Sequence, residues 1–201
     1  GASTATRLNV RLDGEKMKPR DFALVAVDID AIKKFLLKEN NEKRVNIELL
    51  SVVASEMSAS ATVFWAIKDW SLPQLVGYKQ GRDVKALMLL SPRLNYSGLS
   101  IRDAIKHPII REMPLLVAYG GQTAAHKKDA NLLSKQLEKY HQGNPNSLKM
   151  IKVNTTLQGT QLIDPRSPVP AQLTKFIEEQ IFSKASQFPW TDRRGPLESN
   201  D

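Results

Sequence analysis

The stretch that decides the fold is Ile47-Glu-Leu-Leu-Ser-Val-Val-Ala-Ser-Glu-Met-Ser-Ala-Ser-Ala-Thr-Val-Phe-Trp-Ala66. Its first part, residues 47–54, is an apolar run rich in β-branched residues, with the length of a buried strand. A short polar corner follows, and small residues then lead into an apolar pattern with helical spacing. The sequence therefore predicts a buried strand that turns sharply into a helix near residues 57–69, with Glu56 at the turn.

Further strands and helices are expected on both sides of this stretch. Apolar runs predict strands at 84–91 and 114–119 and a weaker one at 148–153. Helical patterns begin at Pro19, ending near Asn40, and cover 101–106, 124–140 and 170–184. Strands that are apolar throughout and alternate with helices favour a three-layer α/β/α fold with a mostly parallel sheet. We expect one domain over residues 1–186 and a flexible tail over 187–201.

Composition indicates a soluble globular protein. The chain has 201 residues, of which 41% are hydrophobic and 25% charged, and no cysteine. No apolar run approaches the length of a membrane span, so we expect no transmembrane segment. The absence of cysteine excludes disulfides and thiol catalysis but leaves the compartment open. Gly1-Ala2-Ser3-Thr4 is neither a signal peptide nor a start methionine, which is typical of a truncated, processed or cloned start.

The formal net charge of +8 favours acidic partners such as nucleic acid or an anionic membrane. The Lys and Arg residues are, however, spread along the chain and interleaved with acids, and no nucleic-acid motif is present. A basic solvated surface is the alternative interpretation, and we do not expect nucleic-acid binding.

The strand, corner and helix around Glu56 have the form of a nucleophile elbow. The order of motifs over residues 1–182 resembles the C-terminal half of an α/β-hydrolase, the fold of esterases and serine aminopeptidases. The elbow reads Ala54-Ser55-Glu56-Met57-Ser58 where that family reads G-x-S-x-G. The resemblance implies strands five to eight of that fold, with Glu56 at the nucleophile position and the Met57 N–H at an oxyanion-hole position.

Two further positions follow from the resemblance. Gly120-Gly121-Gln122-Thr123 resembles the family's G-x-x-D segment, which places Thr123 at the position of the acid. Gln158-Gly159 resembles the loop of the catalytic histidine, which places Gln158 at that position. Gly1-Ala2-Ser3 resembles the end of a segment after strand four, so strands one to four would be missing.

These residues lack the groups that acyl transfer requires. Gln158 cannot accept a proton near neutral pH, and Thr123 supplies no carboxylate. Glu56 can act as a nucleophile, but the resulting ester needs a base-activated water. We therefore predict no confident catalytic residue, no cofactor and no metal, and we take Ser55, Ser58 and His126 as candidate residues of a vestigial ligand pocket. Glu56 is instead expected to stabilise the elbow, by pairing with a buried basic residue or with Gln158.

Three functions remain open from the sequence. The first is a non-catalytic α/β-hydrolase-like domain with a binding or structural role, whose ligand would be a small molecule. The second is an active or altered hydrolase that uses Glu56, and the third is a binder of acidic partners. If the first four strands are missing, the strand at 47–54 has an unpaired edge, which predicts self-association.

Overall fold

The computed structural model of the chain describes residues 19–96 and 99–195. Expectations that concern residues 1–18 and 196–201, including the resemblance at Gly1-Ala2-Ser3, lie outside the described residues. The helices are α1 (Pro19–Asn41), α2 (Glu56–Ser71), α3 (Ile101–Ala104), α4 (Pro108–Glu112), α5 (Ala124–Tyr140) and α6 (Val169–Gln180). The strands are β1 (Ser51–Ser55), β2 (Ala86–Leu90), β3 (Asn95–Tyr96), β4 (Leu99–Ser100), β5 (Leu115–Gly120) and β6 (Leu148–Val153). Short 3₁₀ turns are η2 (Ile47–Leu49), η3 (Pro145–Ser147), η4 (Gly159–Ile163) and η5 (Phe182–Gln187).

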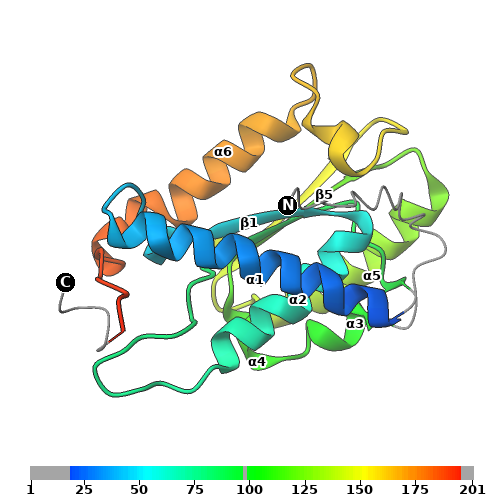
Figure 1. Ribbon diagram of the computed structural model, residues 1–201. Helices are drawn as coiled ribbons and strands as arrows, with labels where there is room; N and C mark the ends of the chain where they lie inside the picture. Colours follow the sequence, from blue (N-terminus) through cyan, green and yellow to red (C-terminus); the bar gives the residue numbers. More distant parts are fainter. Residues whose placement is uncertain (1–18, 97–98, 196–201) are drawn as a thin grey trace, which may run out of the picture.

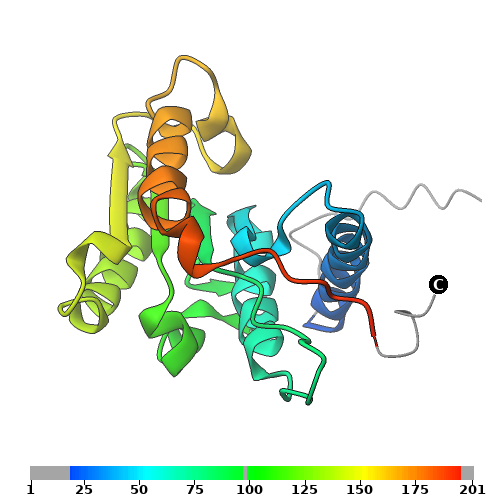
Figure 2. The same cartoon turned by 90° about the vertical axis from the view of Figure 1, so that its left-hand side faces the viewer.

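The main sheet has four parallel strands in the order β1-β2-β5-β6. Helix α6 covers one face, and α2, α4 and α5 cover the other, as Figure 1 shows. The three-layer α/β/α architecture expected from the sequence is confirmed. Helix α1 packs beside α2, next to the β1 edge of the sheet (Figure 2). Among the described residues, no helix combines the length and apolar character needed to span a membrane.

The two central strands are buried on both faces, which is why they read as continuous apolar runs. Successive side chains point to opposite faces, so Leu87 and Leu89 of β2 pack toward α2 and α5. The residues between and beside them, Ala86, Met88 and Leu90, pack toward α6 together with Phe176. Two apolar clusters therefore hold the layers together, one on each side of the sheet.

The first strand is shorter than its apolar run. Residues 47–49 form η2 instead of strand, and pairing between β1 and β2 begins at Ser51 opposite Ala86. The Asn46 side chain causes this, because its Oδ1 accepts the Glu48 N–H at 3.0 Å and closes a turn. The expected strand at 47–54 is therefore wrong over its first residues.

Strand β1 lies at the edge of the described sheet. Its residue Val53 points to the α6 side but is 44% exposed, because α6 contacts the inner strands. Helix α1 also exposes apolar side chains, including Leu24, Ile32 and Phe35. The edge that the sequence analysis expected at this strand is therefore present in the described part of the chain.

The last helix and the tail differ from expectation. Helix α6 ends at Gln180, and η5 covers most of the remaining length assigned to it. The tail expected to be flexible crosses the surface to α1, where Trp190 Nε1 donates to Asn40 O at 2.8 Å. Arg193 is 4% exposed, because its guanidinium enters a buried cluster of charges. Side-chain anchors therefore hold residues 188–195 in place, and the expectation of a loose tail is wrong for this segment.

Candidate functional site

The turn between β1 and α2 has the backbone of a strained corner. Glu56 is the first residue of α2 and has a φ of +47°, which is uncommon for a residue with a side chain. Next to it, the Ser58 hydroxyl accepts the Ser55 N–H at 3.1 Å and donates to the Ser55 carbonyl at 2.8 Å. The corner expected from the sequence is thus built by local hydrogen bonds, and they occupy Ser58.

The residues matched to a catalytic triad lie together at the carboxyl ends of the strands. The Glu56 carboxylate packs directly on Gly159, since a Cβ added there would lie 2.6 Å from Glu56 Oε2. Gly159 has a φ of +52°, a backbone conformation that favours glycine. On the other side, Gln158 Nε2 donates to Thr123 Oγ1 at 3.4 Å. Chain segments far apart in sequence therefore bring Glu56, Thr123 and Gln158 to one site, which we call the elbow site.

The partners of Glu56 differ from those expected. Within the described residues, neither a hydrogen bond nor an ion pair joins its carboxylate to Gln158 or to a buried cation. The Glu56 side chain is exposed to solvent. Its placement in the first turn of α2 is nevertheless favourable for a negative charge, because the helix dipole is positive at this end.

His126 is a histidine whose pKa is influenced by the charge of Glu56 in the elbow site. It is 5% exposed, and its Nδ1 has no hydrogen-bond partner among the described residues. Burial and the charge of Arg93 lower the pKa of His126, while Glu56 and Asp129 act in the opposite direction. The imidazole is therefore neutral at pH 7, and it lies within Coulomb range of Glu56.

The remaining candidates have structural surroundings. Met57 is half-buried and packs with Val25, Ala61 and Leu99. Ser91 has a φ of +49°, and its hydroxyl accepts the Gly159 N–H at 3.0 Å, which anchors the loop that carries Gln158. No group of three or more acidic, histidine or cysteine side chains in the described residues is arranged to hold a metal ion.

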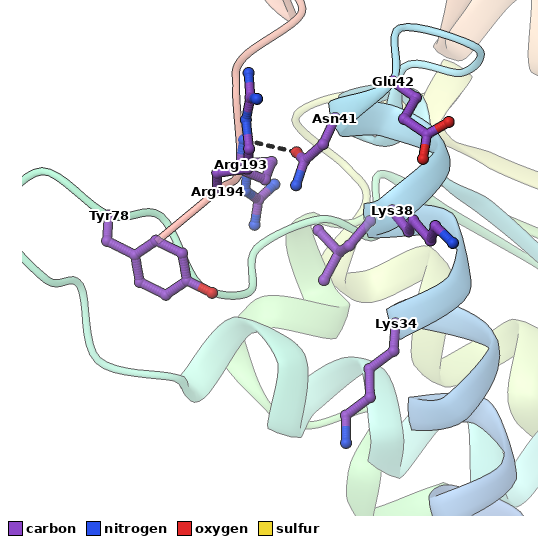
Figure 3. A pocket seen from close by; sticks show the side chains of 8 residues that line it. Lys34, Lys38, Asn41, Glu42, Tyr78, Arg193 and Arg194 are labelled. Atoms are coloured by element: carbon purple, nitrogen blue, oxygen red, sulfur yellow. Dashed lines mark hydrogen bonds between the residues drawn. The ribbon is translucent and has the colours of Figure 1, made fainter. Parts of the chain in front are cut away.

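A basic pocket, which sequence reasoning missed, lies where the tail meets α1. Its volume is about 490 Å³, and its lining includes Lys34, Lys38, Tyr78 and Arg194. Figure 3 shows the two lysines on α1, Tyr78 on the loop before β2, and Arg194 on the tail. The Arg193 N–H donates to Asn41 Oδ1 at 2.9 Å and fixes the tail here. Nothing in the sequence pairs residues so distant, so no local signal could have revealed the pocket.

The fold and the elbow site together define an α/β protein with a strained, carboxylate-bearing turn at the carboxyl end of its edge strand. Comparisons of the chain with protein-family models, with curated proteins and with solved structures found no match.

Proposed function

We propose that the chain is a non-catalytic α/β-hydrolase-like domain with a binding or structural role. One observation carries the proposal: the three positions matched to the triad meet in space, but they hold a carboxylate, a hydroxyl and an amide. The amide of Gln158 is committed to Thr123 and cannot accept a proton near neutral pH. The carboxylate of Glu56 lies against Gly159.

The alternative is a hydrolase that uses Glu56. The exposed Glu56 and the neutral His126 with its unpartnered Nδ1 favour it. Against it, no hydrogen bond joins these two residues in the described structure, and general-base catalysis requires hydrogen-bond reach. A Glu56 ester would therefore lack a positioned base to activate water, and the enzyme would stop after one turnover.

The experiment compares turnover and covalent modification. The protein is incubated with p-nitrophenyl esters and aminoacyl p-nitroanilides, with Glu56→Ala as the variant and the exposed Glu178→Ala as its control. We expect the same background rate for all three proteins and no mass adduct on intact chains. Turnover or a stoichiometric adduct that Glu56→Ala removes and Glu178→Ala retains would refute the proposal and establish the hydrolase.

A second candidate function is the binding of acidic partners, and the basic pocket favours it. Lys34 and Lys38 are exposed and have no ion pair with another described residue. We expect the affinity for a DNA oligonucleotide or for anionic vesicles to fall steeply with salt if this function is real. The double variant Lys34→Glu/Lys38→Glu should then lose binding, whereas Lys175→Glu on α6 should retain it. Absent or salt-independent binding excludes this candidate.

A further inference from the structure

A cavity of about 560 Å³ lies at the amino ends of the parallel strands. Lys85 directly precedes β2 and Pro114 directly precedes β5, and both line it. Glu56, in contrast, follows the last residue of β1, so the cavity and the elbow site lie at opposite ends of the sheet. The volume is in the range of small-molecule sites.

The walls of this cavity are largely apolar and aromatic. Trp70 at the end of α2, Met113 after α4 and Phe188 after η5 contribute to them. Met113 is buried, and the indole of Trp70 is fixed because its Nε1 donates to Val84 O at 2.7 Å. Such walls suit a flat or aliphatic body, and their rigidity lowers the entropic cost of binding it.

The charged groups of the cavity are mainly cationic. Arg82, Lys85 and Lys184 line it, against Glu112 as a carboxylate. Lys184 Nζ donates to Gln180 Oε1 at 3.1 Å. This acceptor is a neutral amide, so it does not neutralise the charge of Lys184. Arg82 is exposed and forms no ion pair with another described residue. An anion is therefore the charge type that this lining attracts.

Lys85 carries a largely buried ammonium whose recorded ion pair, with Glu48, is long. Its side chain is 9% exposed, and Nζ lies 5.4 Å from the ring centroid of Trp70 and 5.2 Å from that of Phe188. Nζ donates to the carbonyl of Arg82, while the Glu48 carboxylate is 4.0 Å away. The Glu48 carboxylate already pairs with Lys79 and with Arg193, in the buried cluster of charges that also contains Asp83.

We propose that this cavity binds a small aromatic carboxylate, with the ring between the apolar walls and the carboxylate paired with Lys85. The ring would extend the aromatic contacts of Trp70 and Phe188, and the carboxylate would give Lys85 a closer counter-ion than Glu48, which is 4.0 Å away. The inference does not depend on the function proposed for the elbow site, because the two sites share no residue.

Binding is coupled to the protonation of Lys85. Burial and the like charge of Lys79 lower the pKa of Lys85 from 10.5 to about 8. The charged groups around it are Glu48, Asp69, Lys79 and Asp83 on the cluster side and Arg82, Glu112 and Lys184 in the cavity. A bound carboxylate raises this pKa, so binding near pH 8 takes up roughly half a proton, and binding at pH 6 takes up almost none.

The test is calorimetric titration with indoleacetate and its uncharged analogue indoleacetamide, in buffers of different ionisation enthalpy. We expect indoleacetate to bind about tenfold or more tightly than the amide at pH 7, the strength of a charge-assisted contact. We expect proton uptake for indoleacetate at pH 8 and none for the amide. These measurements test the proposal on the wild-type protein and do not depend on the folding of a variant.

Variants then locate the site. Lys85→Met keeps the length and apolar character of the stem, and we expect it to lose most of the preference for the acid and all of the proton uptake. Lys175→Met, an exposed lysine on α6, should behave as wild type. The proposal is overturned if the acid and the amide bind wild type equally, if neither binds at millimolar concentration, or if Lys85→Met keeps the preference for the acid.

Discussion

The buried charge cluster that anchors the tail gives the sharpest prediction, the effect of Arg193→Met. Arg193 Nη1 lies 2.6 Å from Asp83 Oδ1 and 3.0 Å from Glu48 Oε1, and Nε donates to Lys79 O at 3.1 Å. The side chains of Asp83 and Glu48 are 0% and 5% exposed. Methionine reproduces the stem of arginine as far as Nε and is apolar, so the variant removes the charge while preserving the packing of the stem.

The size of the effect follows from what remains around the two carboxylates. Removing one partner of a buried ion pair costs about 3–5 kcal/mol, since a charge is left unpaired in a poorly hydrated place. Lys33 Nζ still lies 2.7 Å from Asp83 Oδ2, and Lys79 still pairs with Glu48. We therefore expect the lower end, a loss of about 3 kcal/mol in the free energy of unfolding. For a chain of this size that corresponds to a decrease in Tm of roughly 6–12 °C.

The neighbouring arginine provides a matched control. Arg194 is also an arginine of the tail, but its side chain is 41% exposed and pairs with Asp192 at the surface. Exposed pairs of this kind contribute at most about 1 kcal/mol. Urea denaturation and thermal melting of Arg193→Met and Arg194→Met should therefore differ clearly. Equal, small losses for the two variants would refute the role assigned to the cluster.

The acid limb of the stability curve gives an independent check on the same cluster. Burial opposes the ionisation of Asp83, but hydrogen bonds from Arg193 and Lys33 outweigh it and hold its pKa below the ordinary value. Burial likewise opposes the ionisation of Glu48, and the hydrogen bonds from Lys79 and Thr191 lower its pKa. This stabilisation is present above the unfolded pKa values near 4 and is lost as the pH falls through the folded ones. Arg193→Met should therefore flatten the loss of stability below about pH 4.

Three further predictions concern other parts of the fold. Gly120→Ala should lower the free energy of unfolding by about 3 kcal/mol, because the new Cβ would lie 2.3 Å from the Leu157 carbonyl oxygen. Gly121→Ala meets only the flexible Lys152 side chain, so its loss in urea denaturation should be about 1 kcal/mol or less. The pKa of Lys85 is lowered to about 8, so between about pH 8 and 10 Lys85 is deprotonated in the folded chain but still protonated in the unfolded chain. The free energy of unfolding of the wild type should therefore rise over this range. A Lys85→Met variant that keeps this rise contradicts the assignment of the effect to Lys85. Val53→Lys on the exposed edge strand should reduce concentration-dependent self-association in sedimentation velocity, and a wild-type chain that is monomeric at all concentrations contradicts the prediction.

The architecture was largely predictable because its causes are local. Residues 86–90 and 115–120 are apolar at consecutive positions, which indicates strands buried on both faces. The order of residues through Ser55, Glu56 and the small residues of α2 likewise indicated a sharp strand-to-helix turn, and the strain at Glu56 agrees with it. Where a side chain competes with the backbone, as Asn46 does before η2, the strand boundary was misjudged by a few residues.

The positions of the candidate site could be proposed from the sequence, but the contacts between them could not. The resemblance to α/β-hydrolase motifs placed Glu56, Thr123 and Gln158 after different strands, and the carboxyl ends of parallel strands lie at one edge of the sheet. That Glu56 rests on Gly159 and that Gln158 binds Thr123 depends on how the loops close, which no periodicity records.

By itself, the sequence determined the layers of this protein and the corner at Glu56, because apolar periodicity and turn chemistry act between near neighbours in the chain. Only the tertiary structure decided which charged groups are buried and which partners they have. Arg193 lies in a polar tail by sequence, yet it is buried against Asp83, which lies 110 residues earlier in the chain. The pKa of Lys85 likewise depends on burial and on Lys79, and the proximity of its Nζ to two aromatic rings was not visible in the sequence. Coulomb interactions and desolvation depend on distance in space, which the order of residues does not specify.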